Sequence, residues 1–159
     1  MSAIKGLHHA AYRCRDSEET RNFYEDFLGL PMIDALAIGE TATGRSAPVL
    51  HTFFQMADGS CIAFFEAPDQ PFEFKEQHDF DLHIALTVDH ETLHAMKAKG
   101  EAEGIDTRGI ADHGFVKSIY FRDPNGYVVE LAAPTGKSGG ASRAATDVLG
   151  DWQRSKTGA

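Results

Sequence analysis

Hydrophobic and polar positions follow the same succession of periods twice along the chain. Residues 4–15 alternate as in a strand, and Phe23 and Phe27 recur at helical spacing after Asp16, which can cap a helix. Further strands are expected at 31–38, 49–56 and 60–66, with a loop at 39–48 and a hairpin turn at 57–59. The first part of the chain therefore predicts the order strand, helix, strand, strand, strand.

The second half repeats this order. After a polar and aromatic connector at 68–79, residues 80–88 predict a strand with His83 on its less apolar face, and Asp89 predicts the cap of the following helix. Three more strands are expected at 105–111, 115–122 and 127–132. His9 and His83 both lie in the first strand of their copy, which strengthens the case for an internal repeat.

The repeat predicts an α+β fold built from two βαβββ modules. We expect a first module at 1–68, a connector and second module at 69–134, and a tail at 135–159, with one domain over about 4–134. In the tail, Val148, Leu149 and Trp152 fit either an amphipathic turn that docks on a neighbour or part of a frayed end.

Composition limits the classes of partner. The 159-residue chain carries 15 Lys and Arg against 24 Asp and Glu, a formal net charge of -9. No cluster of basic residues stands out, so we expect neither nucleic acid nor an anionic membrane as a partner. No apolar run resembles a signal peptide or is long enough to span a bilayer. We therefore expect a cytoplasmic protein in which Cys14 and Cys61 stay reduced.

The stretch YFRDPNGYVVE, which ends at Glu130, carries the candidate chemistry. Two strand-like runs are joined by turn residues at 123–126, and Glu130 lies within the second run, where a lone carboxylate is out of place unless something binds it. A metal ion shared with His9 and His83 would explain this carboxylate. His8 is expected to point away from His9, because side chains alternate along a strand.

Two imidazoles and one carboxylate with open positions form a facial ligand set. Such a set suits Fe(II), with Mn(II), Zn(II) and Ni(II) as competitors. The chain has eight histidines, and a strand histidine is also often a hydrogen-bonded structural residue. The pattern alone therefore leaves both a metal site and a structural role open.

Three segments, GLHHAAYRCRDSEETRNFYEDFLGL, HIALTVD and YFRDPNGYVVEL, resemble the vicinal oxygen chelate superfamily. This superfamily includes glyoxalase I, fosfomycin resistance proteins, methylmalonyl-CoA epimerase, bleomycin resistance proteins and type I extradiol dioxygenases. The resemblance covers about residues 4–134. It implies two βαβββ modules that form an open, barrel-like mixed sheet around a metal cavity, usually in a homodimer. It also implies metal ligands at His9, His83 and Glu130, since His9 precedes Asp16 by the family's seven residues.

The resemblance also bears on the reaction. The glyoxalase and epimerase branches use a fourth protein ligand on the last strand of the first module. The matching residue here is Ala63, and Glu66 has the opposite parity and is expected to face away. Three protein ligands leave room for a chelating substrate and dioxygen, as in an extradiol Fe(II) site. The resemblance thus favours an extradiol-type dioxygenase acting on a small catechol-like or vicinal-oxygen substrate.

The segment from His113 to Glu130 is similar to the extradiol ring-cleavage motif, in which the residues that match His113 and Tyr120 contact the substrate and oxygen. We carry these catalytic roles onto His113 and Tyr120. Two departures count against ring cleavage. Extradiol enzymes are longer chains, and they carry an additional acid/base histidine at a place that would lie near Pro68, where this chain has none. His78 of the connector, which is nearer to His83, could substitute for it, and His51 is a more distant candidate.

We further expect a small-molecule substrate to contact Phe65, Phe115, Arg122 and His78. Two alternatives to the dioxygenase stay open. One is a redox-neutral lyase or isomerase of the glyoxalase or epimerase kind. The other is a non-catalytic resistance protein that binds a small drug-like molecule.

Overall fold

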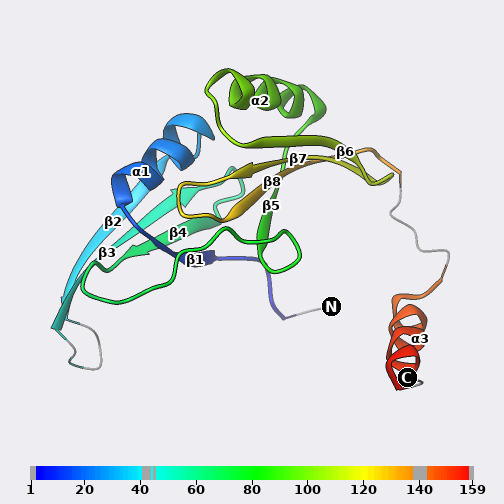
Figure 1. Ribbon diagram of the computed structural model, residues 1–159, viewed down its shortest axis with the longest axis horizontal. Helices are drawn as coiled ribbons and strands as arrows, with labels where there is room; N and C mark the ends of the chain where they lie inside the picture. Colours follow the sequence, from blue (N-terminus) through cyan, green and yellow to red (C-terminus); the bar gives the residue numbers. More distant parts are fainter. Residues whose placement is uncertain (1–2, 41–43, 45, 138–142, 158–159) are drawn as a thin grey trace. The chain divides into compact units, whose positions relative to one another are not determined.

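The computed structural model describes residues 3–40, 44, 46–137 and 143–157. Contacts divide the chain into two compact units, Met1–Ile84 with Phe121–Val129 and Ala85–Tyr120 with Glu130–Ala159. The strands between residues 9 and 66 form one four-stranded sheet, and those between residues 83 and 134 form another (Figure 1). Each sheet is therefore built by one of the two sequence repeats.

The first sheet has the strand order β1-β4-β3-β2. Its strands are β1 (His9–Cys14), β2 (Met32–Glu40), β3 (Ser46–Gln55) and β4 (Cys61–Glu66). β1 pairs with β4 in parallel, whereas β4 with β3 and β3 with β2 are antiparallel. The predicted loop at 39–48 is too long, because the ladder of β2 and β3 continues to the pair Glu40 and Ser46. The predicted turn at 57–59 is confirmed by the Met56 N–H, which donates to the Ser60 carbonyl oxygen (2.8 Å).

The helix after β1 begins at its predicted cap. Oδ1 of Asp16 accepts hydrogen bonds from the backbone N–H groups of Glu18 (2.9 Å) and Glu19 (2.8 Å). These bonds satisfy donors that the first turn of a helix leaves without partners. α1 (Ser17–Arg21) continues into a π-helical segment, η1 (Asn22–Phe27).

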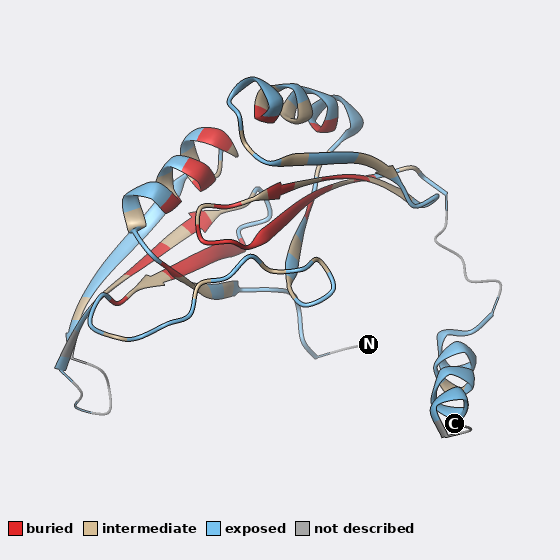
Figure 2. Ribbon diagram, in the orientation of Figure 1, coloured by how far each residue is buried: buried red, intermediate tan, exposed pale blue. Residues whose placement is uncertain are grey.

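Aromatic side chains join this helix to the first sheet. The ring of Tyr24 lies 4.7 Å from that of Phe64 on β4 and 5.6 Å from that of Phe54 on β3, between ring centroids. Tyr24, Phe54 and Phe64 are fully or almost fully buried. In Figure 2, buried residues lie along β4 and on the helix formed by α1 and η1. The helical spacing of aromatic residues therefore supplies one layer of the core and the sheet supplies the other.

The second sheet repeats the order of the first, β5-β8-β7-β6. Its strands are β5 (His83–Thr87), β6 (Thr107–Asp112), β7 (Val116–Arg122) and β8 (Val128–Pro134). α2 (His90–Ala102) follows β5 and begins at Asp89, whose Oδ1 accepts a hydrogen bond from the Thr92 N–H (2.7 Å). The order βαβββ therefore occurs twice, and the predicted α+β fold of two modules is confirmed.

The turn between β7 and β8 belongs to the first unit and is held by a buried carboxylate. Asp123 accepts hydrogen bonds from the Tyr24 hydroxyl (3.1 Å) and from the backbone N–H groups of Asn125 (2.9 Å) and Tyr127 (2.8 Å). Burial raises the pKa of Asp123, although these hydrogen bonds favour its charged form. The predicted turn is thus fixed by polar contacts in the core as well as by its own residues.

The tail contains a third helix, α3 (Ala145–Thr157), so a frayed end is wrong for these residues. Val148, Leu149 and Trp152 are 47%, 57% and 62% exposed. Docking of this face on a neighbour stays a prediction. Among the described residues, no helix is both long enough and apolar enough to cross a membrane.

Candidate metal centre and its neighbours

His9 is the first residue of β1, and its ring meets that of His8. The two Nδ1 atoms lie 2.8 Å apart, so one ring donates a hydrogen bond to the other. When His9 is the donor, its Nε2 keeps the lone pair that a metal ion needs. The expectation that His8 points away from His9 is wrong. His8 precedes β1, so the alternation of side chains along a strand does not reach it.

His51 on β3 lies near His9, and the spacing of residues along the sequence did not predict this. Its buried ring stacks on Phe65 at 3.6 Å between ring centroids, and its Nδ1 donates to the Phe64 carbonyl oxygen (2.9 Å). The ring centroid lies 6.3 Å from that of His9. Because a carbonyl can only accept, the neutral ring of His51 carries its lone pair on Nε2. The approach of His51 to His9 depends on the register of β1, β4 and β3, which the sequence pattern does not supply.

His83 is the first residue of β5, the place that His9 holds in β1. Its Nδ1 donates a hydrogen bond to the backbone carbonyl oxygen of Asp79 (2.7 Å). This bond fixes the tautomer, and the neutral ring therefore carries its lone pair on Nε2. A histidine that binds a metal through one nitrogen typically donates from the other in this way. The local structure of His83 therefore fits a metal ligand.

Glu130 is the third residue of β8, and the residue in the same place on β4 is Ala63. The Glu130 side chain is buried, and the hydroxyl of Ser118 on β7 donates a hydrogen bond to its Oε1. The Asp123 N–H donates to the Tyr127 carbonyl oxygen, which pairs these two residues across β7 and β8. Tyr120 lies three residues before Asp123, and Glu130 lies three residues after Tyr127, so Tyr120 is opposite Glu130. Tyr120 and Glu130 therefore share a face of the second sheet.

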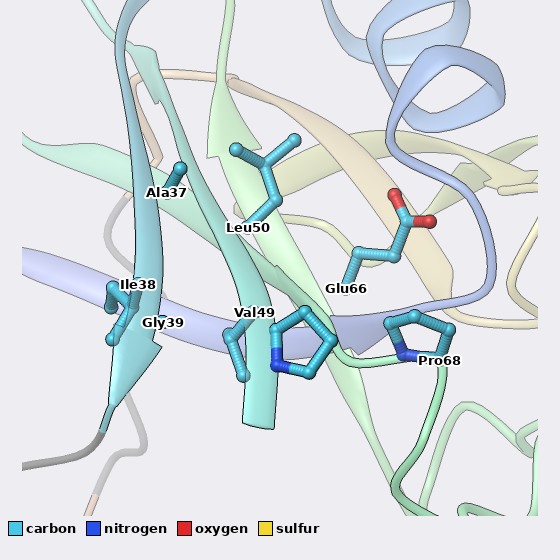
Figure 3. A pocket seen from close by; sticks show the side chains of 8 residues that line it. Ala37, Ile38, Gly39, Val49, Leu50, Glu66 and Pro68 are labelled. Atoms are coloured by element: carbon cyan, nitrogen blue, oxygen red, sulfur yellow. The ribbon is translucent and has the colours of Figure 1, made fainter. Parts of the chain in front are cut away.

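Glu66, the alternative carboxylate of the first module, has another role. Its Oε2 accepts a hydrogen bond from the Ser17 N–H at the start of α1 (2.7 Å). Figure 3 shows this carboxylate at one end of a pocket of about 390 Å³. The rest of the lining is apolar and consists of Ala37, Ile38, Gly39, Pro48, Val49, Leu50 and Pro68. Glu66 thus helps to begin a helix, and the parity argument against it as a ligand agrees with this contact.

His113 and Tyr120, the two predicted catalytic residues, are in direct contact. His113 lies in the turn between β6 and β7, and its Nε2 is 3.0 Å from the Tyr120 hydroxyl. Arg108 on β6 was not predicted as a site residue, yet its guanidinium carbon lies 5.3 Å from the centroid of the Tyr120 ring. His113 and Tyr120 can share a proton, and Arg108 places a positive charge beside them.

The four predicted substrate contacts occupy different surroundings. Phe65 stacks on His51, and Phe115 is half exposed in the turn that holds His113. Nδ1 of His78 accepts from the Phe80 N–H (3.1 Å). Nη1 of Arg122 donates to the carbonyl oxygens of Gln77 (3.0 Å) and Gly126 (3.1 Å), which ties the connector to the hairpin turn. Substrate contact by any of these four residues stays a prediction.

The three predicted metal ligands fall in two units. His9 and His83 lie in the first unit and Glu130 in the second. Within the described part of the chain, no group of three or more His, Cys, Asp and Glu side chains is placed to hold a metal ion. The local contacts of each residue fit a ligand, and their meeting at one ion stays a prediction.

The twofold succession of one strand, one helix and three strands agrees with one known family. Residues 6–131 match the glyoxalase/bleomycin resistance protein/dioxygenase superfamily. The chain belongs to this superfamily. The name of this superfamily spans three different functions, so membership defines the fold more closely than the reaction.

Several members of the superfamily are similar over most of the chain. The metallothiol transferase FosB of Shouchella clausii is 25% identical over 138 residues, which are 83% of this chain and 82% of FosB. FosX of Listeria monocytogenes, a fosfomycin resistance protein, is 23% identical with a TM-score of 0.64, covering 84% of this chain and 96% of FosX. A glyoxylase/bleomycin resistance protein/dioxygenase domain from Frankia sp. EAN1pec is 17% identical with a TM-score of 0.65, covering 83% of this chain and 99% of that domain. The structural likenesses speak for a shared fold.

Proposed function

We propose that this protein is a metal-dependent enzyme in which His9, His83 and Glu130 hold one divalent ion. The donor set supports this, because the contacts of His8 with His9 and of Asp79 with His83 suit rings that bind through Nε2. Fe(II) is the preferred ion, with Mn(II), Zn(II) and Ni(II) as competitors. A mutant of the Listeria FosX was crystallised with Mn(II), which supports a divalent ion in this superfamily.

The substrate that we propose is a small catechol-like molecule, and the reaction is extradiol-type ring cleavage with dioxygen. The ion would supply Lewis acidity and lower the pKa of a coordinated substrate hydroxyl. The observation that carries this proposal is the contact of His113 Nε2 with the Tyr120 hydroxyl at 3.0 Å. His113 and Tyr120, which share a proton, can donate a proton to a substrate oxygen or accept one from it. Phe65 and Phe115 are available to contact an apolar ring.

A second function is favoured by the similarity to FosB and FosX. It is a redox-neutral reaction on a small phosphonate, in which dioxygen takes no part. The mutant FosX structure contains 1S,2S-dihydroxypropylphosphonic acid, a molecule with two neighbouring hydroxyl groups. Such a molecule offers a metal ion the same pair of vicinal oxygens as a catechol. The two functions thus share the proposed ligands and differ in the need for dioxygen.

Oxygen consumption separates the two functions. We expect protein purified without air to contain iron, and to consume dioxygen with at least one member of a panel of catechols. Tyr120→Phe should lower this rate roughly 100-fold or more while the iron content stays the same, because the change removes one proton from the pair. His83→Ala should lose both metal and activity.

Other outcomes point elsewhere. No oxygen uptake by iron-loaded protein, together with conversion of fosfomycin by the Mn(II)-loaded protein in ³¹P NMR, supports the phosphonate reaction. Tight binding of a small molecule that survives both metal removal and His83→Ala supports a non-catalytic resistance protein. We also propose a homodimer, which sedimentation equilibrium of the full chain would test.

A further inference from the structure

A second pocket, of about 320 Å³, lies in the first unit beside the end of β1. Its lining consists of Arg13, Cys14, Arg15, Ala67, Pro68, Gln70, Pro71, Phe72 and Phe74. Arg13 comes four residues after His9 on β1, which places their Cα atoms roughly 13 Å apart. The pocket is therefore separate from the proposed ligand His9. Two arginines in one pocket are unexpected in a chain with a net charge of -9.

Arg13 has a structural task and donors to spare. Its Nη2 donates to the carbonyl oxygens of Ala67 and Gln70, both at 3.0 Å, and these bonds hold the start of the connector against β1. Its guanidinium carbon lies 5.2 Å from the centroid of the Phe72 ring. Nε of Arg13 is buried and has no hydrogen-bond partner in the described part of the chain. A buried donor without a partner is costly, so its presence asks for an explanation.

Arg15 is less occupied than Arg13. Its side chain makes one long hydrogen bond, from Nη1 to the Pro124 carbonyl oxygen at 3.4 Å. The guanidinium carbon lies 5.0 Å from the centroid of the Phe74 ring. Among the residues that the structure describes, no carboxylate forms an ion pair with Arg13 or Arg15. Each guanidinium group thus lies over one phenylalanine ring, and its remaining N–H groups are available as donors.

These donors match an oxyanion. A guanidinium group presents its N–H bonds as a planar fork that fits two oxygens of a phosphate or a carboxylate. We propose that this pocket binds a small molecule through a phosphate or carboxylate group, which Arg13 and Arg15 hold together. The exposed ring of Phe72, with Pro71 beside it, would contact an apolar part of the same molecule. A purely structural role accounts for Arg13, whose hydrogen bonds fix the connector. It does not account for Arg15, whose side chain makes only one long hydrogen bond among the described residues.

The test uses the full-length protein after removal of metal with a chelator, at constant ionic strength. Inorganic phosphate, phenyl phosphate and benzoate are titrated separately and followed by calorimetry and by the NMR signals of the arginine side chains. We expect saturable binding of at least one probe, with the signals of Arg13 and Arg15 shifting. The comparison of phosphate with benzoate identifies the oxyanion, and the comparison of phosphate with phenyl phosphate measures the contribution of the aromatic rings.

Arg15→Gln is the decisive variant, because Arg15 is exposed and its side chain makes one long bond. We expect this change to weaken binding about tenfold or more, the loss of one charge-assisted contact. Arg154→Gln on α3 removes the same charge outside the pocket and should leave binding unchanged. Phe74→Leu keeps both charges and should weaken binding less than Arg15→Gln does.

Three results would overturn the site. One is the lack of saturable binding with all three probes. Another is an equal effect of Arg15→Gln and Arg154→Gln, which would indicate general attraction to positive charge. The third is binding that requires metal and disappears in His83→Ala, which would place the anion at the proposed metal centre instead. Loss of catalytic activity plays no part in this test, so the pocket and the proposed function can fail independently.

Discussion

The hydroxyl of Ser118 on β7 donates a hydrogen bond to Oε1 of Glu130 on β8. Ser118 is fully buried and Glu130 is 8% exposed, so this bond fixes the orientation of a carboxylate that water hardly reaches. We therefore expect Ser118 to orient the carboxylate of Glu130 in the proposed metal site.

Replacing either partner should weaken metal binding to different degrees. Glu130→Gln removes the charge that we propose to hold the ion, and it should abolish binding at stoichiometric metal. Ser118→Ala leaves the carboxylate and removes its orienting bond, so we expect affinity to fall roughly 10- to 100-fold. Competition of each variant with a fluorescent chelator measures these affinities.

Glu66→Gln is the matched control for this prediction. Glu66 is the strand carboxylate of the first module, but its Oε2 accepts the Ser17 N–H at the start of α1. The change should leave metal affinity unaltered and lower the stability of the folded protein by about 1 kcal/mol, the usual effect of weakening a hydrogen bond at a helix start. Metal loss in Glu66→Gln equal to that in Glu130→Gln would make Glu66 a fourth ligand.

The contact between His8 and His9 predicts a ranking of two neighbouring variants. His9→Ala removes a proposed ligand and should lose the ion. His8→Ala removes the ring that meets His9 Nδ1 and should weaken metal binding roughly 10- to 100-fold, because it frees the orientation of His9. Metal content after dialysis against a weak chelator, compared with His94→Ala on α2, would check this ranking. Equal losses in the two variants would assign ligation to His8 as well.

The sequence pattern predicted the order of the elements because each repeat contains residues that mark where its elements begin. A histidine begins β1 and β5, and a capping Asp begins the helix that follows each strand. The parity of strand residues also separated Glu66 from Ala63, since a shift of three positions along a strand changes the face. Local periodicity was sufficient for these features, and the comparison with known proteins bears out the fold.

Contacts between strands were beyond the reach of periodicity. His51 meets His9, and Arg108 meets Tyr120, across neighbouring parts of a sheet whose register the sequence does not state. His8 was misplaced for a different reason. Its alternation with His9 was assumed, whereas the strand begins one residue later. The predictions that failed thus concern side-chain contacts that depend on strand pairing and on where strands end. They do not concern contacts that depend on residue type.

Asp89 predicts a pH dependence of stability. Its hydrogen bond from the Thr92 N–H lowers the pKa of the Asp89 carboxyl below the ordinary value of 3.8. A lowered carboxyl pKa in the folded state contributes stability that is present above the ordinary pKa and is lost as the pH falls through the folded value. The natural chain should therefore be more stable than Asp89→Asn at neutral pH, and the gap should close below about pH 4.

Urea unfolding of both proteins at a series of pH values measures this gap. Burial raises the pKa of Asp123 and so acts on stability in the opposite direction as the pH rises, but Asp123 is present in both proteins. Its effect cancels in the difference between them. A gap that stays constant from neutral to acid pH would show that the charge of Asp89 does not stabilise α2.

Gly126, in the turn between β7 and β8, predicts a large loss of stability when a single methyl group is added. Its φ is 97°, a left-handed conformation that disfavours other residues. A Cβ built at this position would overlap the backbone carbonyl oxygen of Lys75 in the connector, which cannot move aside as a flexible side chain would. Strain and overlap together should make Gly126→Ala less stable by about 3 kcal/mol.

Gly29→Ala separates the two causes. Gly29, after η1, has a φ of 81°, but a Cβ there would meet no atom within 4 Å. This variant carries the strain without the overlap and should lose about 1 kcal/mol. Urea unfolding midpoints of the two variants measure the difference. Equal losses would mean that the connector at Lys75 yields to the added methyl group, in which case the turn and the connector are less firmly joined than the bonds of Arg122 to Gln77 and Gly126 indicate.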